Sequence, residues 1–273
     1  MKHLTLLLPL CIAALFSCSN APVMSIDAPV RFAVISGTAP ESPYTPYPAD
    51  LSRLIAALNR ENPAIVAHIG NIFYGGAAQG LREEDVTRQI AARPAFFDRL
   101  NPVCEYTAGE LDRFGGSLGL FESVTGKPAF HSFSYGPVFF LSIDSDDAGT
   151  ASISKNQEER IIRELERNRN KAAIVILSYR PFFLKNEFAG YLTTVAGADR
   201  FHALFAKHRV RAVISAAGEI VSRTDRDGIA YINAGCVPMY KRDAYDRFRY
   251  HVIDITNDAV VVPGRKLGAR GRA

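Results

Sequence analysis

Five side chains with oxygen atoms stand in short segments between apolar runs of the sequence: Asn71, Glu110, Asp112, Tyr179 and Glu219. Carboxylate and amide oxygens are the ligands of hard divalent cations, so four of these side chains could together hold a single divalent metal. Tyr179 could join them only as a phenolate, which is uncommon because a phenol has a pKa of about 10. The chemistry open to this set is hydrolysis assisted by one metal ion.

The histidines do not add to this set. Apart from His3, they are scattered along the chain: His68, His131, His202, His208 and His251. None follows another at a spacing of four residues, as a helical pair of metal ligands would. This pattern favours structural or surface roles over metal binding. The acidic run from Asp144 to Asp147 lacks the spacing of a cation-binding loop and predicts a solvated turn.

The elements that must position these residues alternate between strands and helices. Apolar runs predict strands over 30–36, 64–69, 130–135, 138–143, 172–177, 210–215, 220–224, 229–233 and 250–256. Helical spacing predicts helices over 50–62, 83–100 with an interruption at Pro94, 198–208, and one that a capping box at Ser154 opens, with Ile161, Ile162 and Leu165 on its inner face. Helices early in the chain and hairpins late indicate an α/β domain with mixed sheets.

Five segments in order resemble the calcineurin-like metallophosphoesterase family. That family has an Asp and a His two apart after its first strand, then Gly-Asp, then Gly-Asn-His-Asp or Gly-Asn-His-Glu, then a His, then Gly-His-x-His. This chain keeps the order and the intervals of these motifs. At their ligand-bearing and neighbouring positions it carries Gly37, Ala39, Asn71, Glu110, Leu111, Asp112, Tyr179, Ala217 and Glu219. The resemblance implies two mixed β-sheets packed face to face, with helices outside.

The resemblance also implies a two-metal phosphoesterase site, and these residues argue against it. Two cations held close together need anionic carboxylates and neutral imidazoles. Gly37, Ala39, Leu111 and Ala217 offer no donor atom, and Asn71 has an oxygen without a charge. Glu110 stands where the family's Asn meets the substrate, and an anion there should repel a phosphoryl group. No intact catalytic set and no metal centre are therefore predicted, and the chain is not expected to be an enzyme of the usual type.

Three functions remain open. The favoured one is an inactive, lipid-anchored domain that binds an unknown protein or small molecule through its former active-site cleft, with no cofactor. The loop with Tyr44 and Tyr47 would line the mouth of that cleft. The alternative is an atypical metal-dependent phosphoesterase with a single divalent metal. The third is a structural lipoprotein without a binding cleft, which a filled pocket at the motif positions would indicate.

The amino-terminal residues predict export and a lipid anchor. Lys2 and His3 precede an apolar run too short to span a bilayer, and small residues follow it. The ending Leu-Phe-Ser-Cys resembles a bacterial lipobox, so residues 1–17 are predicted to be a lipoprotein signal peptide and Cys18 to be lipidated. Lipoprotein modification supplies more than one chain, which stable anchoring requires. An ordinary cleaved signal is the alternative. The expected location is the bacterial cell envelope, on a membrane-anchored lipoprotein that is periplasmic or surface-facing.

The rest of the chain is predicted to form one domain. The sequence has 273 residues, of which 48% are hydrophobic and 22% charged, with a formal net charge of +4. We expect a tether over 18–29, a domain over 30–263 and a basic flexible tail over 264–273. Basic residues are interspersed with acidic ones, so no nucleic-acid-binding surface is predicted. Cys104 and Cys236 could form a disulfide in an exported protein, although two buried thiols are favoured.

Overall fold

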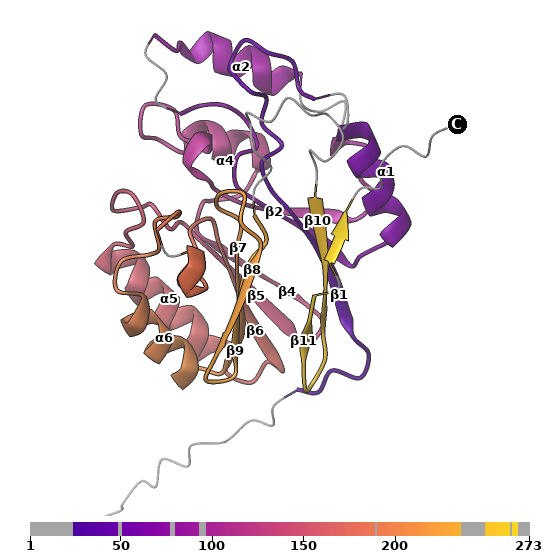
Figure 1. Ribbon diagram of the computed structural model, residues 1–273, viewed down its shortest axis with the longest axis vertical. Helices are drawn as coiled ribbons and strands as arrows, with labels where there is room; N and C mark the ends of the chain where they lie inside the picture. The colour runs from indigo at the N-terminus through magenta and orange to yellow at the C-terminus, as the bar shows by residue number, and fades with distance from the viewer. Residues whose placement is uncertain are drawn as a thin grey trace, which may run out of the picture.

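Two mixed β-sheets face each other in the computed structural model, which describes residues 24–48, 51–76, 80–92, 97–188, 190–235, 249–262 and 264–266. The first sheet has the strand order β11-β10-β1-β2-β3, with β12 paired to β10. The second has the order β4-β5-β6-β7-β9-β8. Helices cover the outer side of each sheet (Figure 1). The predicted fold class, two mixed sheets packed face to face with helices outside, is confirmed.

The strands of each sheet and the helices have the following bounds. The first sheet consists of β1 (Val30–Ile35), β2 (Ile65–Ile69), β3 (Val103–Thr107), β10 (Arg249–Ile255), β11 (Val260–Val261) and β12 (Gly264–Lys266). The second consists of β4 (His131–Tyr135), β5 (Val138–Ile143), β6 (Ala173–Ser178), β7 (Val210–Ser215), β8 (Ser222–Arg226) and β9 (Ile229–Asn233). The helices are α1 (Leu51–Glu61), α2 (Glu83–Ala91), α4 (Gly119–Thr125), α5 (Lys155–Arg167) and α6 (Ala198–Lys207), with 3-10 turns η1 (Glu110–Asp112) and η2 (Asn186–Phe188).

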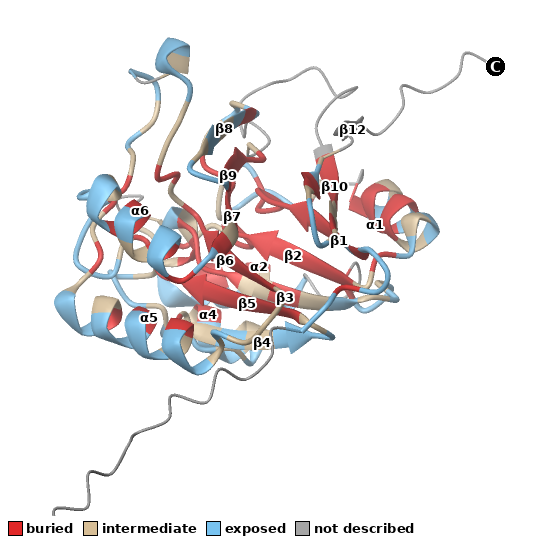
Figure 2. Ribbon diagram, turned by 90° about the horizontal axis from the view of Figure 1, so that it is seen from below, coloured by how far each residue is buried: buried red, intermediate tan, exposed pale blue. Residues whose placement is uncertain are grey.

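The main core lies between the two sheets. Successive strand residues point to opposite faces, so one set of apolar side chains from each sheet meets in the middle. Phe32 of β1 and Phe140 of β5 make an edge-to-face contact there, with ring centroids 5.2 Å apart. The other set packs under the helices, α1 on the first sheet and α5 with α6 on the second. Figure 2 shows buried strands that lie between helices, and the outer sides of these helices are exposed.

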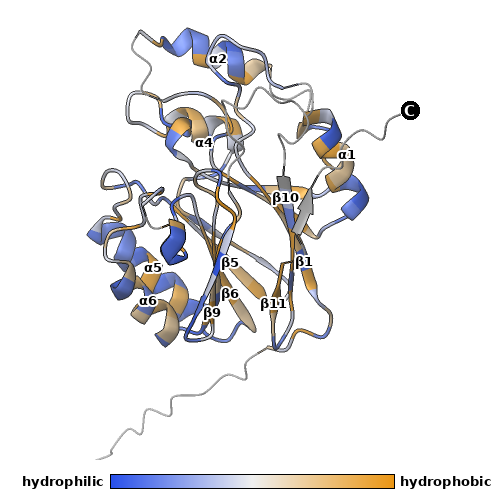
Figure 3. Cartoon of the chain, in the orientation of Figure 1, coloured by the Kyte–Doolittle hydropathy of each residue, from blue (hydrophilic) through white to orange (hydrophobic). Residues whose placement is uncertain are grey.

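Helix α5 shows how the sequence sets a local boundary. Ser154 caps it, because its Oγ accepts a hydrogen bond from the backbone N–H of Gln157 at 3.1 Å. The predicted reciprocal half of the capping box is absent, since the Gln157 amide instead bonds both backbone groups of Asp144. Ile161 and Leu165 are buried as predicted, whereas Ile162 is exposed, so its assignment to the inner face was wrong. The outward face of α5 is hydrophilic (Figure 3).

The direction of the strands determines where functional residues can gather. β1, β2 and β3 run parallel, and so do β5, β6, β7 and β9. The two sheets meet at their carboxyl ends, where Ser36 Oγ, after β1, donates to the Ala216 carbonyl after β7 at 3.4 Å. Ligands of α/β sheets bind at such carboxyl ends. All five resemblance motifs follow strands that end at this edge.

Several predicted boundaries differ from the structure. β3 was not predicted, because an edge strand with Cys104 and Glu105 in its middle has no clear apolar alternation. The helix predicted over 83–100 ends at Ala91, and its interruption at Pro94 lies outside the described residues. Gly264–Lys266 pairs with β10, so this part of the expected tail joins the first sheet.

The signal peptide, Cys18, Cys236 and the end of the tail also lie outside the described residues, so the possible Cys104–Cys236 pair does as well. Among the described helices, none combines the length and the apolar composition that a bilayer crossing requires.

Candidate functional site

Tyr179 fills the centre of the place where the five motifs meet. It follows β6 directly, and only 2% of its surface is exposed. Its ring lies against Gly70, where a Cβ would come within 2.5 Å of Tyr179 Cδ2. Gly70 also has a φ of +73°, which a side chain would strain. The glycine between β2 and Asn71 therefore makes room for the aromatic ring.

The Tyr179 hydroxyl joins two of the predicted site residues. It accepts a hydrogen bond from Asn71 Nδ2 at 3.2 Å and donates one to Glu110 Oε1 at 3.1 Å. Asn71 Oδ1 in turn accepts from the backbone N–H of Leu111 at 3.1 Å. The side chains that stand at the second, third and fourth motifs thus use their polar atoms on one another.

Glu110 continues this chain of hydrogen bonds to the other side of the site. Arg180 Nη2 donates to Glu110 Oε2 at 2.7 Å, and Arg180 Nε donates to Asp146 Oδ1 at 3.2 Å. Burial acts to lower the pKa of Arg180, but the carboxylates of Asp146 and Glu110 outweigh it and raise that pKa. The guanidinium of Arg180 offsets the charge of Glu110, which weakens the repulsion of a phosphoryl group that was expected from that anion.

Asp112 holds the loop that carries this network. Its carboxylate is fully buried and accepts four backbone N–H bonds, at 2.6 to 3.3 Å, from Gly109, Asn71, Ile72 and Phe73. Burial raises the pKa of Asp112 to about 6, and the four N–H bonds act against that rise. The carboxylate is ionised at neutral pH. Both of its oxygens are used to join the turn after β2 to the turn after β3.

The remaining motif positions are occupied by backbone contacts. The backbone N–H of Gly37 donates to the Gly70 carbonyl at 3.1 Å, and that of Ala39 donates to the Asn71 carbonyl at 2.8 Å. The Ala217 carbonyl accepts from Asn233 Nδ2 at 2.9 Å. These bonds tie the strand ends together, and no donor side chain stands at Gly37, Ala39 or Ala217.

The fifth motif is covered from the loop after β6. A Cβ at Gly218 would lie 2.3 Å from Leu192 Cδ2, so Leu192 packs directly on the glycine turn that precedes Glu219. Glu219 itself is exposed beyond the end of β7. The structure brings Asn71, Glu110 and Tyr179 together through side-chain bonds.

Such a site does not fit two divalent cations. Cations need oxygens and imidazole nitrogens that converge on open space, whereas the Asp112 oxygens receive four N–H groups and the Tyr179 phenol takes up the space beside Asn71. Within the described residues, no three His, Cys, Asp or Glu side chains are grouped so that they could hold a metal ion. Glu110, Asp112 and Glu219, the three carboxylates of the single-metal alternative, do not form such a group.

The acidic run after β5 was misread from the sequence. Asp144 is buried and its carboxylate pairs with Arg113, while Asp146 pairs with Arg180. Asp147 Oδ1 accepts from the backbone N–H of Ser154 at 2.7 Å. This is an ion-paired support of the site rather than the predicted solvated turn. The sequence feature that could have indicated this pairing is the run of acidic residues after β5, together with Arg180 after β6.

The histidines lie in structural positions. His68 is fully buried, and its Nε2 forms a 2.7 Å hydrogen bond with Thr38 Oγ1 under the first motif. His202 lies between the Tyr231 hydroxyl and Asp227 Oδ2, each 2.8 Å away. These contacts agree with the structural roles that were predicted.

Tyr47, which was expected at the mouth of the site, is buried and donates to the Ile72 carbonyl at 3.0 Å. Tyr44 is exposed.

Comparison with solved structures gives the class of the fold. The chain aligns with the purple acid phosphatase PPD1 of yellow lupin (Lupinus luteus) seeds over 90% of this chain and 52% of that one, at 14% identity and a TM-score of 0.63. It spans about half the length of that phosphatase. It aligns with a dimetal phosphatase from Danio rerio over 89% and 98%, at 13% identity and a TM-score of 0.69.

A third similar structure is GAP50, described as the anchor in the inner membrane complex of Plasmodium. It aligns over 89% of this chain and 90% of that one, at 12% identity and a TM-score of 0.53. No protein-family model matches the chain, and no curated protein matches it in sequence. At these identities the likeness defines the fold: the chain has the fold of the calcineurin-like metallophosphoesterases.

Proposed function

We propose that this protein is a catalytically inactive, lipid-anchored domain of metallophosphoesterase fold that binds a partner in the bacterial cell envelope. One observation carries the proposal: the Tyr179 hydroxyl bonds Asn71 and Glu110 at the centre of the five motifs. Two-metal hydrolysis needs convergent anions and imidazoles around that centre. A neutral amide, a buried phenol and an ion-paired glutamate replace them, so the domain works without a metal cofactor.

Partner binding is assigned to the rim of the carboxyl edge. Tyr44 in the loop after β1 and Tyr191 in the loop after β6 have 69% and 76% of their surface exposed. Val221, after β7, is exposed as well. Tyrosine is enriched in protein interfaces because it offers a large rigid contact with a polar tip. A filled centre was the expected mark of a structural lipoprotein, so binding through the former cleft is given up, and the exposed tyrosines are what favour a binding surface on the rim. GAP50 gives an instance of this fold described as an anchor.

The test of inactivity measures metal content and ester cleavage on the same preparation. We expect substoichiometric manganese, zinc and iron in protein purified without chelator, and no turnover of p-nitrophenyl phosphate or bis(p-nitrophenyl) phosphate in their presence. Tight stoichiometric metal together with turnover that Asn71→Ala abolishes would establish the alternative, an atypical metal-dependent phosphoesterase. Asp258→Ala, an exposed acid far along the chain from every motif, is the matched control for the loss of turnover.

Rim binding is tested by crosslinking in the cell envelope. A photoreactive residue at Tyr191 should capture one defined partner, and Tyr44→Ser should weaken that capture while Ile162→Ser, another exposed apolar position on the outer face of α5, should not. A photoreactive residue at position 162 that captured the same partner equally strongly would show that the rim is not the specific binding surface. Anchoring is tested separately, by the mass of the peptide that begins at Cys18.

A further inference from the structure

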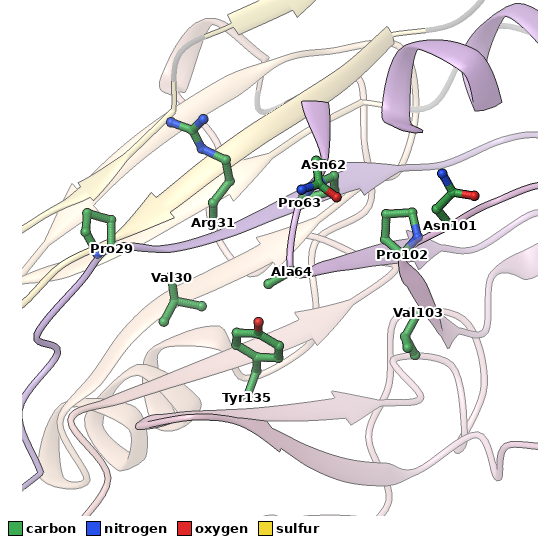
Figure 4. A pocket seen from close by; sticks show the side chains of 10 residues that line it. All are labelled: Pro29, Val30, Arg31, Asn62, Pro63, Ala64, Asn101, Pro102, Val103 and Tyr135. Carbon is green, nitrogen blue, oxygen red and sulfur yellow. The ribbon is translucent and has the colours of Figure 1, made fainter. Parts of the chain in front are cut away.

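The end of the sandwich opposite the motifs carries an open groove of about 500 Å³ (Figure 4). It lies at the amino ends of β1, β2 and β3, beside the turn that joins β4 to β5. Its lining includes Pro29, Asn62, Pro102, Val103 and Tyr135. Val103 and Tyr135 have 63% and 45% of their surface exposed, although both are large apolar or aromatic side chains. β3 and β4 are the edge strands of their sheets, so nothing in either sheet covers this side.

A group of cations lies next to the groove. Lys171 Nζ donates to the Gly136 carbonyl at 3.4 Å, directly after Tyr135. Arg209 Nη2 donates to the Arg169 carbonyl at 3.5 Å. Among the described residues, no acidic side chain forms an ion pair with Arg169, Lys171 or Arg209. These three cations and Tyr135 are named the basal surface below.

The acidic side chains near the basal surface leave it positive. Glu166 faces His208, with Oε1 3.7 Å from Nε2, and Asp27 accepts from Ser25 Oγ at 2.7 Å. Arg31, on the groove wall, is held by Asp254 through two bonds of 2.8 and 2.9 Å. Arg169 and Lys171 lie between α5 and β6 and Arg209 lies between α6 and β7, and Lys171 reaches the turn that follows the exposed Tyr135.

The chain leaves the domain at this same end. The backbone N–H of Met24, the first described residue, donates to the Asn170 carbonyl at 2.9 Å, between Arg169 and Lys171. Met24 is itself exposed. Cys18 precedes it by six residues, and six residues reach at most about 20 Å. A lipid on Cys18 would hold Met24 within that distance of the membrane.

We infer that the basal surface lies on the anionic phospholipid headgroups of the membrane, with Arg169, Lys171 and Arg209 against the phosphates and Tyr135 at the interface. The inference rests on the proposed lipid anchor. A short tether makes the contact intramolecular, so a weak surface suffices. Tyrosine occupies membrane interfaces, and basic residues near anionic headgroups bind them. The carboxyl edge with Tyr44 and Tyr191 then faces away from the membrane, toward a partner.

The sequence contains no tryptophan, so a single introduced tryptophan reports without background. The lipidated protein is reconstituted in vesicles of phosphatidylcholine, with or without phosphatidylglycerol, whose acyl chains carry bromine as a quencher. We expect the Tyr135→Trp variant to be quenched and the matched Tyr191→Trp variant, at the opposite end, to keep its emission. Quenching should require phosphatidylglycerol and fall at high salt.

Variants that each remove one positive charge from the basal surface test the membrane contact further. Neutralising Arg169, Lys171 or Arg209 to Gln in the Tyr135→Trp protein should weaken the surface-bound state about fivefold per residue. Lys155→Gln is the matched control, because Lys155 is an exposed cation on the first turn of α5, at the other end of the domain. Equal quenching at both tryptophan positions, or quenching that ignores phosphatidylglycerol, would overturn the inference.

The two proposals fail in different ways. An acylated Cys18 peptide together with equal quenching at positions 135 and 191 would refute the orientation and leave the anchor intact. An unmodified Cys18 peptide would remove the anchor and this membrane contact with it. Neither result affects the measurements of metal content and ester cleavage, which test catalytic inactivity.

Discussion

The two ends of the sandwich differ in how their polar side chains are bonded. At the carboxyl edge, Asn71, Glu110, Tyr179 and Arg180 bond one another, and the ring of Tyr179 occupies the centre. At the amino end, an exposed tyrosine lines an open groove, and three cations without an acidic partner among the described residues lie beside it. The end where the fold gathers its motifs has become internal structure, and the other end remains open to contacts.

The difference follows from the same strand geometry. Parallel strands bring their carboxyl ends to one edge, where Asn71, Asp112 and Tyr179 are buried in this chain while Glu110 stays exposed. Buried polar groups in a low dielectric must be paired, and these are paired with each other. Substitutions in the bonded centre of the carboxyl edge should therefore act on the free energy of unfolding, whereas substitutions at its exposed rim or at the amino end should act on binding.

The largest effect on stability is expected at Asp112. Asp112→Ala removes an ionised carboxylate and leaves four buried backbone N–H groups without an acceptor. We expect a loss of about 4 kcal/mol in the free energy of unfolding, measured by urea denaturation. Asp258→Ala, at an exposed position, should change that free energy by less than about 0.5 kcal/mol. Similar values for the two variants would mean that the carboxyl edge is not held by this carboxylate.

The pH dependence of stability offers a second measure of the same group. The pKa of Asp112 is raised to about 6 in the folded protein, from an ordinary value of 3.8. Between these values the folded state binds more protons than the unfolded state, so the Asp112 contribution falls as pH rises through that window and is constant above it. The difference between these two pKa values corresponds to about 3 kcal/mol in the free energy of unfolding.

Other carboxylates act in the opposite sense, such as Asp85, whose pKa is lowered by its hydrogen bond with Arg82. The measurement is therefore the difference in unfolding free energy between the natural protein and Asp112→Asn at several pH values. We expect that difference to shift toward the variant as pH rises from about 4 to about 6. A flat difference would contradict the raised pKa.

The sequence predicted the fold better than the site. Long apolar runs such as Val138–Ile143 and Ala173–Ser178 predict buried strands, because only a sheet covered on both faces accepts them. The loss of ligand types at Gly37 and Ala217 was readable from residue identity alone. The edge strand Val103–Thr107 was missed, since its half-exposed residues carry a weak pattern.

The replacement network could not be read from the sequence. Tyr179 and Asn71 are 108 residues apart, and nothing in their spacing says that the phenol bonds the amide. The pairing of Arg180 with both Glu110 and Asp146 depends on side-chain direction at three strand ends. The basal surface was missed for the same reason, because Met24, Tyr135 and Lys171 come together only through the register of the strands.

A smaller effect is expected at the centre of the site. Tyr179→Phe keeps the ring against Gly70 and removes the hydroxyl that bonds Asn71 Nδ2 and Glu110 Oε1. We expect a loss of about 1.5 kcal/mol in the free energy of unfolding, since the two hydrogen bonds of the Tyr179 hydroxyl are removed. Tyr44→Phe, in an exposed loop, should be neutral. A stabilised Tyr179→Phe protein would show that the phenol is strained and would reopen the centre as a binding site.

The smallest effect on stability is expected at the basal surface. Tyr135→Ser, Lys171→Gln and Arg209→Gln should each change the free energy of unfolding by less than about 0.5 kcal/mol, because these side chains are at least partly exposed and no acidic partner in the described part of the chain holds the two cations. Thermal unfolding and urea denaturation of the three variants provide the measurement. A loss above about 1 kcal/mol at any of them would mean that this end is also held by its polar contacts, and the contrast with the carboxyl edge would disappear. Unchanged stability with weakened membrane contact would separate the two ends, one fixed by folding and the other available for binding.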